Sequence, residues 1–199
     1  MKLILASQSP RRIQMLKVLG ITFDTMPSDI DEETELKDPP EVVEFLAHAK
    51  ARHIAERLKA EGSADEETWV LGADTIVVLG SEILNKPTTR EHAYQMLMRM
   101  SGRHHRVYTG VCLINVHTGV ADTKHESSSV FFRSLDPAEV RAYAKTEEPM
   151  DKAGAYALQG AAGAFIDKVD GCYSNIIGLP MPLTVRMLRE AGLKVLGMP

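Results

Sequence analysis

Groups that bind phosphate gather early in the chain, in the segment Ser7-Gln8-Ser9-Pro10-Arg11-Arg12. Two hydroxyl groups, two guanidinium groups and free backbone N–H groups meet there at the expected N-terminus of a helix, where unpaired donors and the helix dipole attract anions. The segment lacks the glycines and the lysine of a Walker loop, so it is not a P-loop. A plain serine N-cap followed by proline, with both arginines solvated, is the alternative. The six residues leave both interpretations open.

Asp74 is a carboxylate within an apolar stretch, Gly72-Ala73-Asp74-Thr75. An unpaired charge would be costly there, so Asp74 needs a metal ion, an arginine or a water molecule to polarise. A turn aspartate bonded to nearby backbone is the other interpretation. Glu32, in the acidic run Asp29-Ile30-Asp31-Glu32-Glu33, is a candidate to join Asp74 at a metal, because Mg²⁺ takes carboxylates, phosphate oxygens and water. A solvated acidic loop is the alternative for that run.

Two lysines, a glutamine and a pair of histidines are weaker signals. Lys50 and Lys86 are ordinary lysines on a local view, and most lysines are solvated. The segment over residues 148–160 is rich in groups able to contact a base edge, and Gln159 offers both a donor and an acceptor. His104 and His105 are adjacent and would point to opposite faces of a strand, which argues against a histidine metal site.

Strand and helix patterns alternate along the chain and must position these groups. Apolar runs predict strands over residues 2–6, 21–26, 69–73, 76–79, 107–116 and 120–133, with a short return strand ending near residues 85–87. Asp74-Thr75 is expected to interrupt the third run. Helical patterns cover residues 10–19, 41–61, 88–100, 137–145 and 182–191. We expect one α/β domain over residues 1–199, with a mixed, partly antiparallel sheet, flanking helices and two lobes around a central cleft.

The composition limits the partners. The 199 residues are 44% hydrophobic and 25% charged, as in an ordinary globular protein, and the formal charge of −4 supplies no basic field for nucleic acid or an anionic membrane. Cys112 and Cys172 are too few for a disulfide framework. Because the apolar run at the N-terminus is short and no later run reaches ~18 apolar residues, we expect a cytoplasmic protein.

Several motifs follow one another in a fixed order. They are Leu5-Ala6-Ser7-Gln8-Ser9-Pro10-Arg11-Arg12, Gly72-Ala73-Asp74-Thr75, Lys86-Pro87, Ser101-Gly102 with Thr109-Gly110, Glu148-Pro149-Met150-Asp151-Lys152-Ala153-Gly154-Ala155-Tyr156, Gln159-Gly160 and Gly178-Leu179-Pro180. In this order they closely resemble the Maf family of nucleoside triphosphate pyrophosphatases, over almost the whole chain. The resemblance implies a fold similar to that of the inosine triphosphate pyrophosphatases, removal of pyrophosphate from a nucleotide with Mg²⁺ or Mn²⁺ as cofactor, and a homodimer.

The resemblance also implies roles for individual residues. Asp74 matches the proton acceptor, and Glu32 matches an acidic position near the metal, which Asp74 would share. The positions that match the phosphate side are Ser9, Arg11, Arg12, Lys50 and Lys86.

Three positions bear on the choice of nucleotide. The subgroup that acts on dTTP and UTP carries an arginine, a threonine and a glutamine where this chain has Arg12, Thr75 and Gln159. A glutamine can pair with the imide edge of thymine or uracil. The expected function is therefore hydrolysis of dTTP and UTP, with modified pyrimidine nucleotides as further candidates, in a house-cleaning role or with an influence on cell division. A non-catalytic nucleotide-binding regulator of cell division is the alternative, and a nucleotidyltransferase is a second rival.

Overall fold

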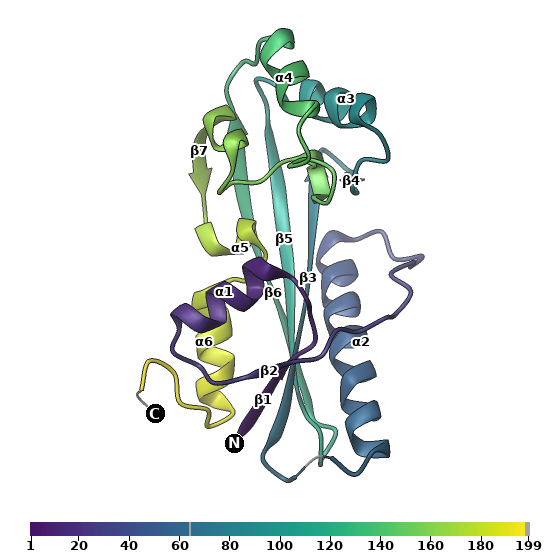
Figure 1. The fold of residues 1–199 in the computed structure, drawn as a ribbon, viewed down its shortest axis with the longest axis vertical. Helices are drawn as coiled ribbons and strands as arrows, with labels where there is room; N and C mark the ends of the chain where they lie inside the picture. Colours follow the sequence, from purple (N-terminus) through teal and green to yellow (C-terminus); the bar gives the residue numbers. More distant parts are fainter. Residues whose placement is uncertain (64, 198–199) are drawn as a thin grey trace. The chain divides into compact units, whose positions relative to one another are not determined.

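The computed structural model describes residues 1–63 and 65–197, so the expected domain over residues 1–199 includes three positions outside the described residues. Within them the strands form one mixed sheet in the order β2-β1-β3-β5-β6-β7, with β4 paired to β3 (Figure 1). β1 is parallel to β2 and β3, whereas β4 and β7 are antiparallel to their neighbours. The strands are β1 (Lys2–Leu5), β2 (Asp24–Thr25), β3 (Thr68–Leu79), β4 (Glu82–Leu84), β5 (His104–Asn115), β6 (Ala121–Phe132) and β7 (Ile166–Asp170). The predicted mixed α/β class is confirmed.

Prolines mark where most of the long helices begin. The helices are α1 (Pro10–Val18), α2 (Pro39–Ala60), α3 (Arg90–Met100), α4 (Pro137–Ala144), α5 (Tyr173–Ile177) and α6 (Met181–Glu190), with 3₁₀ turns η1 (Ala153–Ala155) and η2 (Ala161–Phe165). Proline occupies the first turn of α1, α2, α4 and α6, where its missing N–H costs no hydrogen bond. Among the described residues, no helix has the length and apolar character that crossing a membrane requires.

The chain divides into two compact units, each with its own core. Unit 1 comprises Met1–Asp74, Thr109–Glu126 and Gly178–Pro199, and unit 2 comprises Thr75–Tyr108 and Ser127–Ile177. Three boundaries fall within β3, β5 and β6, and the fourth follows α5, between Ile177 and Gly178. The single domain and the cleft expected from the sequence stay predictions.

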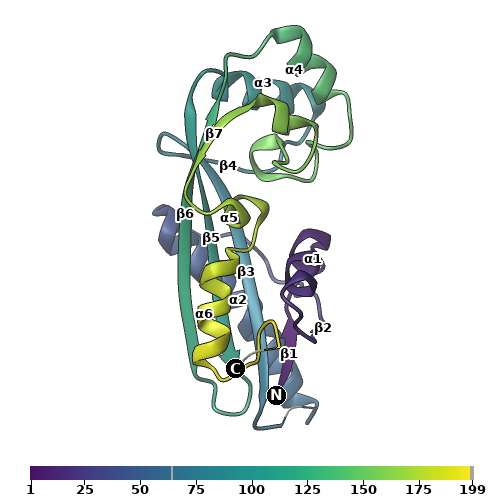
Figure 2. The ribbon, with the colours of Figure 1, turned by 90° about the vertical axis from the view of Figure 1, so that its left-hand side faces the viewer.

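In unit 1, α2 covers one face of the sheet while α1 and α6 lie on the other (Figures 1 and 2). Two glycines let α2 approach the strands closely. A Cβ at Gly72 would stand 2.3 Å from the carbonyl oxygen of Ala47, and one at Gly110 would stand 2.1 Å from that of Val43. Any larger residue would push the helix away, so these glycines set the distance between α2 and the sheet.

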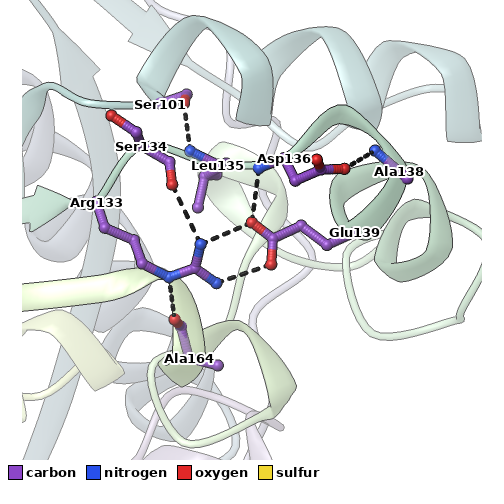
Figure 3. A network of polar contacts seen from close by, with 8 residues as sticks. All are labelled: Ser101, Arg133, Ser134, Leu135, Asp136, Ala138, Glu139 and Ala164. Carbon is purple, nitrogen blue, oxygen red and sulfur yellow. Dashed lines mark hydrogen bonds and ion pairs between the residues drawn. The ribbon is translucent and has the colours of Figure 1, made fainter.

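In unit 2, a polar network fixes the start of α4. The guanidinium of Arg133 donates to both carboxylate oxygens of Glu139, at 2.7 and 2.8 Å, and to the carbonyl oxygen of Ala164 at 2.9 Å (Figure 3). Glu139 also accepts from the backbone N–H of Asp136, which completes a capping box. Arg133, together with that backbone bond, lowers the pKa of Glu139 to about 2. The network ties the first turn of α4 to η2.

Two details of the predicted strands are wrong. Asp74-Thr75 does not interrupt the third run, because β3 continues through both residues. Of the strand predicted over residues 21–26, only Asp24–Thr25 pairs as a strand, with β1. The patterns also missed β7, whose sequence Ile166–Asp170 is largely exposed and charged, and α5, which is too short for a helical period to appear.

Candidate active site

The loop that precedes α1 places Ser9 at the start of the helix. Ser9 occupies the N-cap position, yet its hydroxyl group makes no capping bond with the described residues. Its own backbone N–H donates instead to the hydroxyl oxygen of Ser7 at 3.2 Å. Ser9 therefore occupies the N-cap before Pro10, as the plain N-cap interpretation has it, but its side chain makes no capping bond within the described part of the chain. The hydroxyl of Ser9 stands at the start of a helix of nine residues, where an anion is favoured.

Arg12 is anchored through its guanidinium. Its Nε donates to the carbonyl oxygen of Gly178 at 2.8 Å, just before α6 begins. Burial lowers the pKa of Arg12, and the negative charge of Asp74 opposes that shift. Arg11 lowers the pKa of Arg12 further, while Glu32 raises it. Asp74, Arg11 and Glu32 thus all act electrostatically on Arg12 within unit 1.

Lys50 contacts both Asp74 and Glu32, the two carboxylates that the sequence analysis predicts near a metal ion. Its ammonium nitrogen lies 2.7 Å from Oδ1 of Asp74 and 2.7 Å from Oε1 of Glu32. The side chains of Lys50 and Asp74 are 10% and 9% exposed, whereas that of Glu32 is 58% exposed. Asp74 is thus a buried residue of a strand with a charged partner, and the turn interpretation is wrong.

The local sequence explains why Lys50 reaches Asp74. Side chains two residues apart in a strand share a face, so Asp74 lies on the face where Gly72 admits α2. A Cβ at Gly72 would meet both Ala47 and Ala51, and Lys50 lies in the same helical turn as these two residues. The close approach of helix and strand thus brings the lysine to the carboxylate.

The Glu32–Asp74 pair fits a divalent cation with oxygen ligands. Both carboxylates already converge on one positive charge, the ammonium of Lys50. Within the described part of the chain, no three or more His, Cys, Asp or Glu residues gather as a ready metal site. Two protein carboxylates suit Mg²⁺ or Mn²⁺ when phosphate oxygens and water complete the coordination. These two residues could therefore hold a metal together with a nucleotide.

The other predicted residues belong to unit 2. Thr75 follows Asp74 in β3 and is half-buried, while Lys86 is exposed just after β4. The backbone N–H of Gly154 donates to the carbonyl oxygen of Asn85 at 3.3 Å, which links the residue before Lys86 to the segment over residues 148–160. Gln159 is exposed at a turn closed by a bond from the N–H of Gly160 to the carbonyl of Ala157, 3.1 Å long.

The paired histidines point to opposite faces of β5, as expected. His104 is exposed, and His105 is buried with its Nε2 2.7 Å from the hydroxyl oxygen of Tyr156. Burial lowers the pKa of His105 to about 4, and the neighbouring His104 contributes in the same direction. His105 is therefore a core residue whose ring contacts Tyr156, on the opposite face of β5 from His104.

The structure therefore assembles part of the predicted site directly. Glu32, Lys50 and Asp74 are in contact, and Arg12 shares their electrostatic neighbourhood. The sequence patterns assigned no role to Gly178, which accepts from Arg12. The signal for it was the motif Gly178-Leu179-Pro180, whose glycine adopts a φ of 121° that other residues avoid.

Comparisons with known proteins give a consistent result. The sequence model of the family described as Maf-like protein matches residues 2–191. A protein of Pelotomaculum thermopropionicum named dTTP/UTP pyrophosphatase is 45% identical over 196 residues, which cover 98% of this chain and 99% of the relative. A relative of the same name from Desulforamulus reducens is 43% identical over 97% of this chain and 98% of its own length. Another from Clostridium perfringens is 39% identical over 98% of this chain and 100% of its own length.

Proposed function

Because this chain belongs to the Maf-like protein family, we propose that it is a nucleoside triphosphate pyrophosphatase that hydrolyses dTTP and UTP to the nucleoside monophosphate and pyrophosphate. Full-length relatives at 39–45% identity carry the name dTTP/UTP pyrophosphatase. The observation that carries the proposal is the contact of the buried Lys50 with Asp74 and Glu32, because it concentrates a base, a cation and a second carboxylate at one point.

The proposed phosphate side is cationic. The hydroxyl of Ser9 and the guanidinium of Arg11 would bind phosphate oxygens at the N-terminus of α1, where the helix dipole assists. Lys50 and Lys86 would add positive charge as the phosphates become more negative in the transition state. A divalent cation between Glu32 and Asp74 would neutralise charge on the triphosphate.

Asp74 is the proposed proton acceptor. As the oxygen of a water molecule attacks the α-phosphorus, Asp74 accepts the proton that the water loses. The bond between the α-phosphorus and the bridging oxygen breaks, and pyrophosphate leaves with that oxygen. Lys50 holds Asp74 in place before substrate arrives, because its ammonium bonds to Oδ1 at 2.7 Å.

Base selection is the proposed role of Gln159, with Thr75 and Arg12. The amide of Gln159 can donate to a carbonyl and accept from N3–H of thymine or uracil. A site that pairs with this edge leaves polar groups unpaired when another base enters, and this mismatch provides discrimination.

We also propose a homodimer that acts on nucleotides in the cytoplasm, without nucleic acid or membrane as a partner. The free thiols of Cys112 and Cys172 and the formal charge of −4 support the compartment and the absence of polyanionic partners. Sedimentation at micromolar concentration measures the oligomeric state, and a monomer there would contradict the dimer.

A substrate panel tests the proposal. Purified protein is given canonical and modified nucleoside triphosphates with Mg²⁺ or Mn²⁺, and free pyrophosphate is measured. We expect steady turnover, with dTTP and UTP among the best substrates. Binding without turnover would instead favour a regulator that only binds nucleotides, and a requirement for an acceptor molecule would favour a nucleotidyltransferase.

A further inference from the structure

Glu148 is a half-buried carboxylate at the turn that carries Gln159. Its Oε1 accepts a hydrogen bond from the hydroxyl of Tyr143, 2.9 Å away, and its Oε2 accepts from the backbone N–H of Ala161 at 3.1 Å. Tyr143 is itself buried in α4, where its ring packs edge-on against Phe165. The carboxylate therefore links α4 to the backbone of Ala161, two positions after Gln159.

The carboxylate of Glu148 also lies against the Cα of Gly160. A Cβ at Gly160 would lie 2.0 Å from Oε1 of Glu148 and 2.5 Å from Oε2. The backbone of Gly160, with φ of −106°, is one that other residues adopt, so conformational freedom does not require a glycine there. The space next to the Cα is already filled by the carboxylate of Glu148, so a methyl group at residue 160 would force that side chain away from its bonds with Tyr143 and Ala161.

The position of Gln159 depends on the same turn. Its side chain makes no hydrogen bond with the residues that the structure describes, so only its backbone places it. That backbone is closed by the bond from the N–H of Gly160 to Ala157 and followed by the bond from Ala161 to Glu148. Moving the carboxylate would therefore shift Gly160 and Ala161, the two residues that follow Gln159.

We propose that Glu148 is a positioning residue that determines base selectivity by holding Gln159 in place through Gly160 and Ala161. The inference rests on the proposed function. It adds to that function the residue on which recognition of the base by Gln159 depends. When the amide of Gln159 is misplaced, the enzyme should lose discrimination between bases before it loses catalytic rate, because other residues bind the phosphates.

The first test compares Glu148→Gln with Glu147→Gln. Glu147 is the neighbouring glutamate, exposed and paired with Arg90, so it is the matched control. The glutamine amide keeps the shape of Glu148 but offers one acceptor where two donors point. We expect Glu148→Gln to reduce the ratio of kcat/KM for dTTP to that for dCTP about tenfold, and Glu147→Gln to leave it unchanged. In a Gln159→Ala background the Glu148→Gln effect should vanish, since Glu148 acts through Gln159.

The second test asks whether the effect of a methyl group at residue 160 depends on the presence of Glu148. Gly160→Ala alone should lower the same ratio, because the new methyl group displaces the carboxylate. In the Glu148→Ala background, Gly160→Ala should add nothing, because the clash is gone. Hydrogen exchange without nucleotide should be faster over residues 157–163 in Glu148→Gln than in the wild type, since one acceptor has been lost.

The outcomes separate the two claims. A wild-type protein that turns over neither dTTP nor UTP would refute the proposed function, while hydrogen exchange would still test whether Glu148 holds the turn. A selective wild type with a Glu148→Gln ratio within about twofold of it would refute the inference and leave the function standing. An equal fall of kcat/KM for every nucleotide, or unchanged exchange over residues 157–163, would likewise overturn the role of Glu148.

Discussion

Lys50 and Asp74, 24 residues apart in the chain, form a buried ion pair in which the ammonium nitrogen lies 2.7 Å from Oδ1. Glu32 makes a second contact with the same ammonium, from a more exposed position. Removing one member of a buried pair leaves a charge without compensation, so a variant in this cluster changes stability as well as chemistry. Each prediction about it therefore includes a measurement of stability.

Asp74→Asn is expected to reduce kcat at least about 100-fold, because an amide cannot accept the proton of the attacking water. The variant should remain folded, since Lys50 keeps its contact with Glu32. Pyrophosphate release with dTTP and thermal unfolding measure the two effects. Asp122→Asn, at a half-exposed carboxylate paired with Lys124, is the control and should retain activity. Near-normal turnover by Asp74→Asn would remove Asp74 from the catalytic role.

Lys50→Met should leave Glu32 and Asp74 without their cation. We expect the free energy of unfolding to fall by about 3 kcal/mol without added metal, because one carboxylate is buried. Added Mg²⁺ or Mn²⁺ should then raise the melting temperature of this variant more than that of the wild type, since it can replace the ammonium. Lys59→Met, on the exposed side of the same helix, is the control. Equal metal-induced shifts in the wild type and Lys50→Met would contradict a metal site at these two carboxylates.

Gly72→Ala is expected to destabilise the protein by about 3 kcal/mol, because the methyl group would stand 2.3 Å from the carbonyl oxygen of Ala47. The displaced helix should also separate Lys50 from Asp74 and lower kcat. Gly119→Ala, where a Cβ meets no described atom within 4 Å, should cost only about 1 kcal/mol from its positive φ. Urea unfolding compares the two, and similar losses would show that α2 can move away at little cost.

His105 predicts a loss of stability on acidification. Its pKa is about 4 in the folded protein and near the ordinary 6.5 when unfolded, so the unfolded chain binds a proton first as the pH falls. The stability that neutral His105 contributes is fully present above pH 6.5 and declines as the pH falls from 6.5 to 4. The free energy of unfolding should fall by about 2 kcal/mol from about pH 7.5 to about pH 5. Urea unfolding of His105→Gln should show a flatter pH dependence, whereas His104→Gln, which removes only the smaller of the two causes, should keep most of the wild-type slope. An unchanged slope in His105→Gln would place the acid sensitivity elsewhere.

Much of the architecture could be predicted from local sequence. Prolines at the first turn and apolar residues at helical spacing identified α1, α2, α4 and α6, because these signals act within one element. The prediction that the strand is interrupted at Asp74 was wrong because the outcome depends on a contact with another element. A carboxylate breaks an apolar run in the sequence, but it does not break a strand when a lysine from another element neutralises it.

By itself, the sequence determined the α/β class and the motif order that indicates a nucleotide pyrophosphatase. Only the tertiary structure decided which charges meet. The contact of Lys50 with Glu32 and Asp74 depends on how closely α2 packs on the sheet, which is a property of two glycines and their neighbours in space. The fit of Glu148 against Gly160 is of the same kind, because steric exclusion between residues twelve positions apart leaves no local pattern.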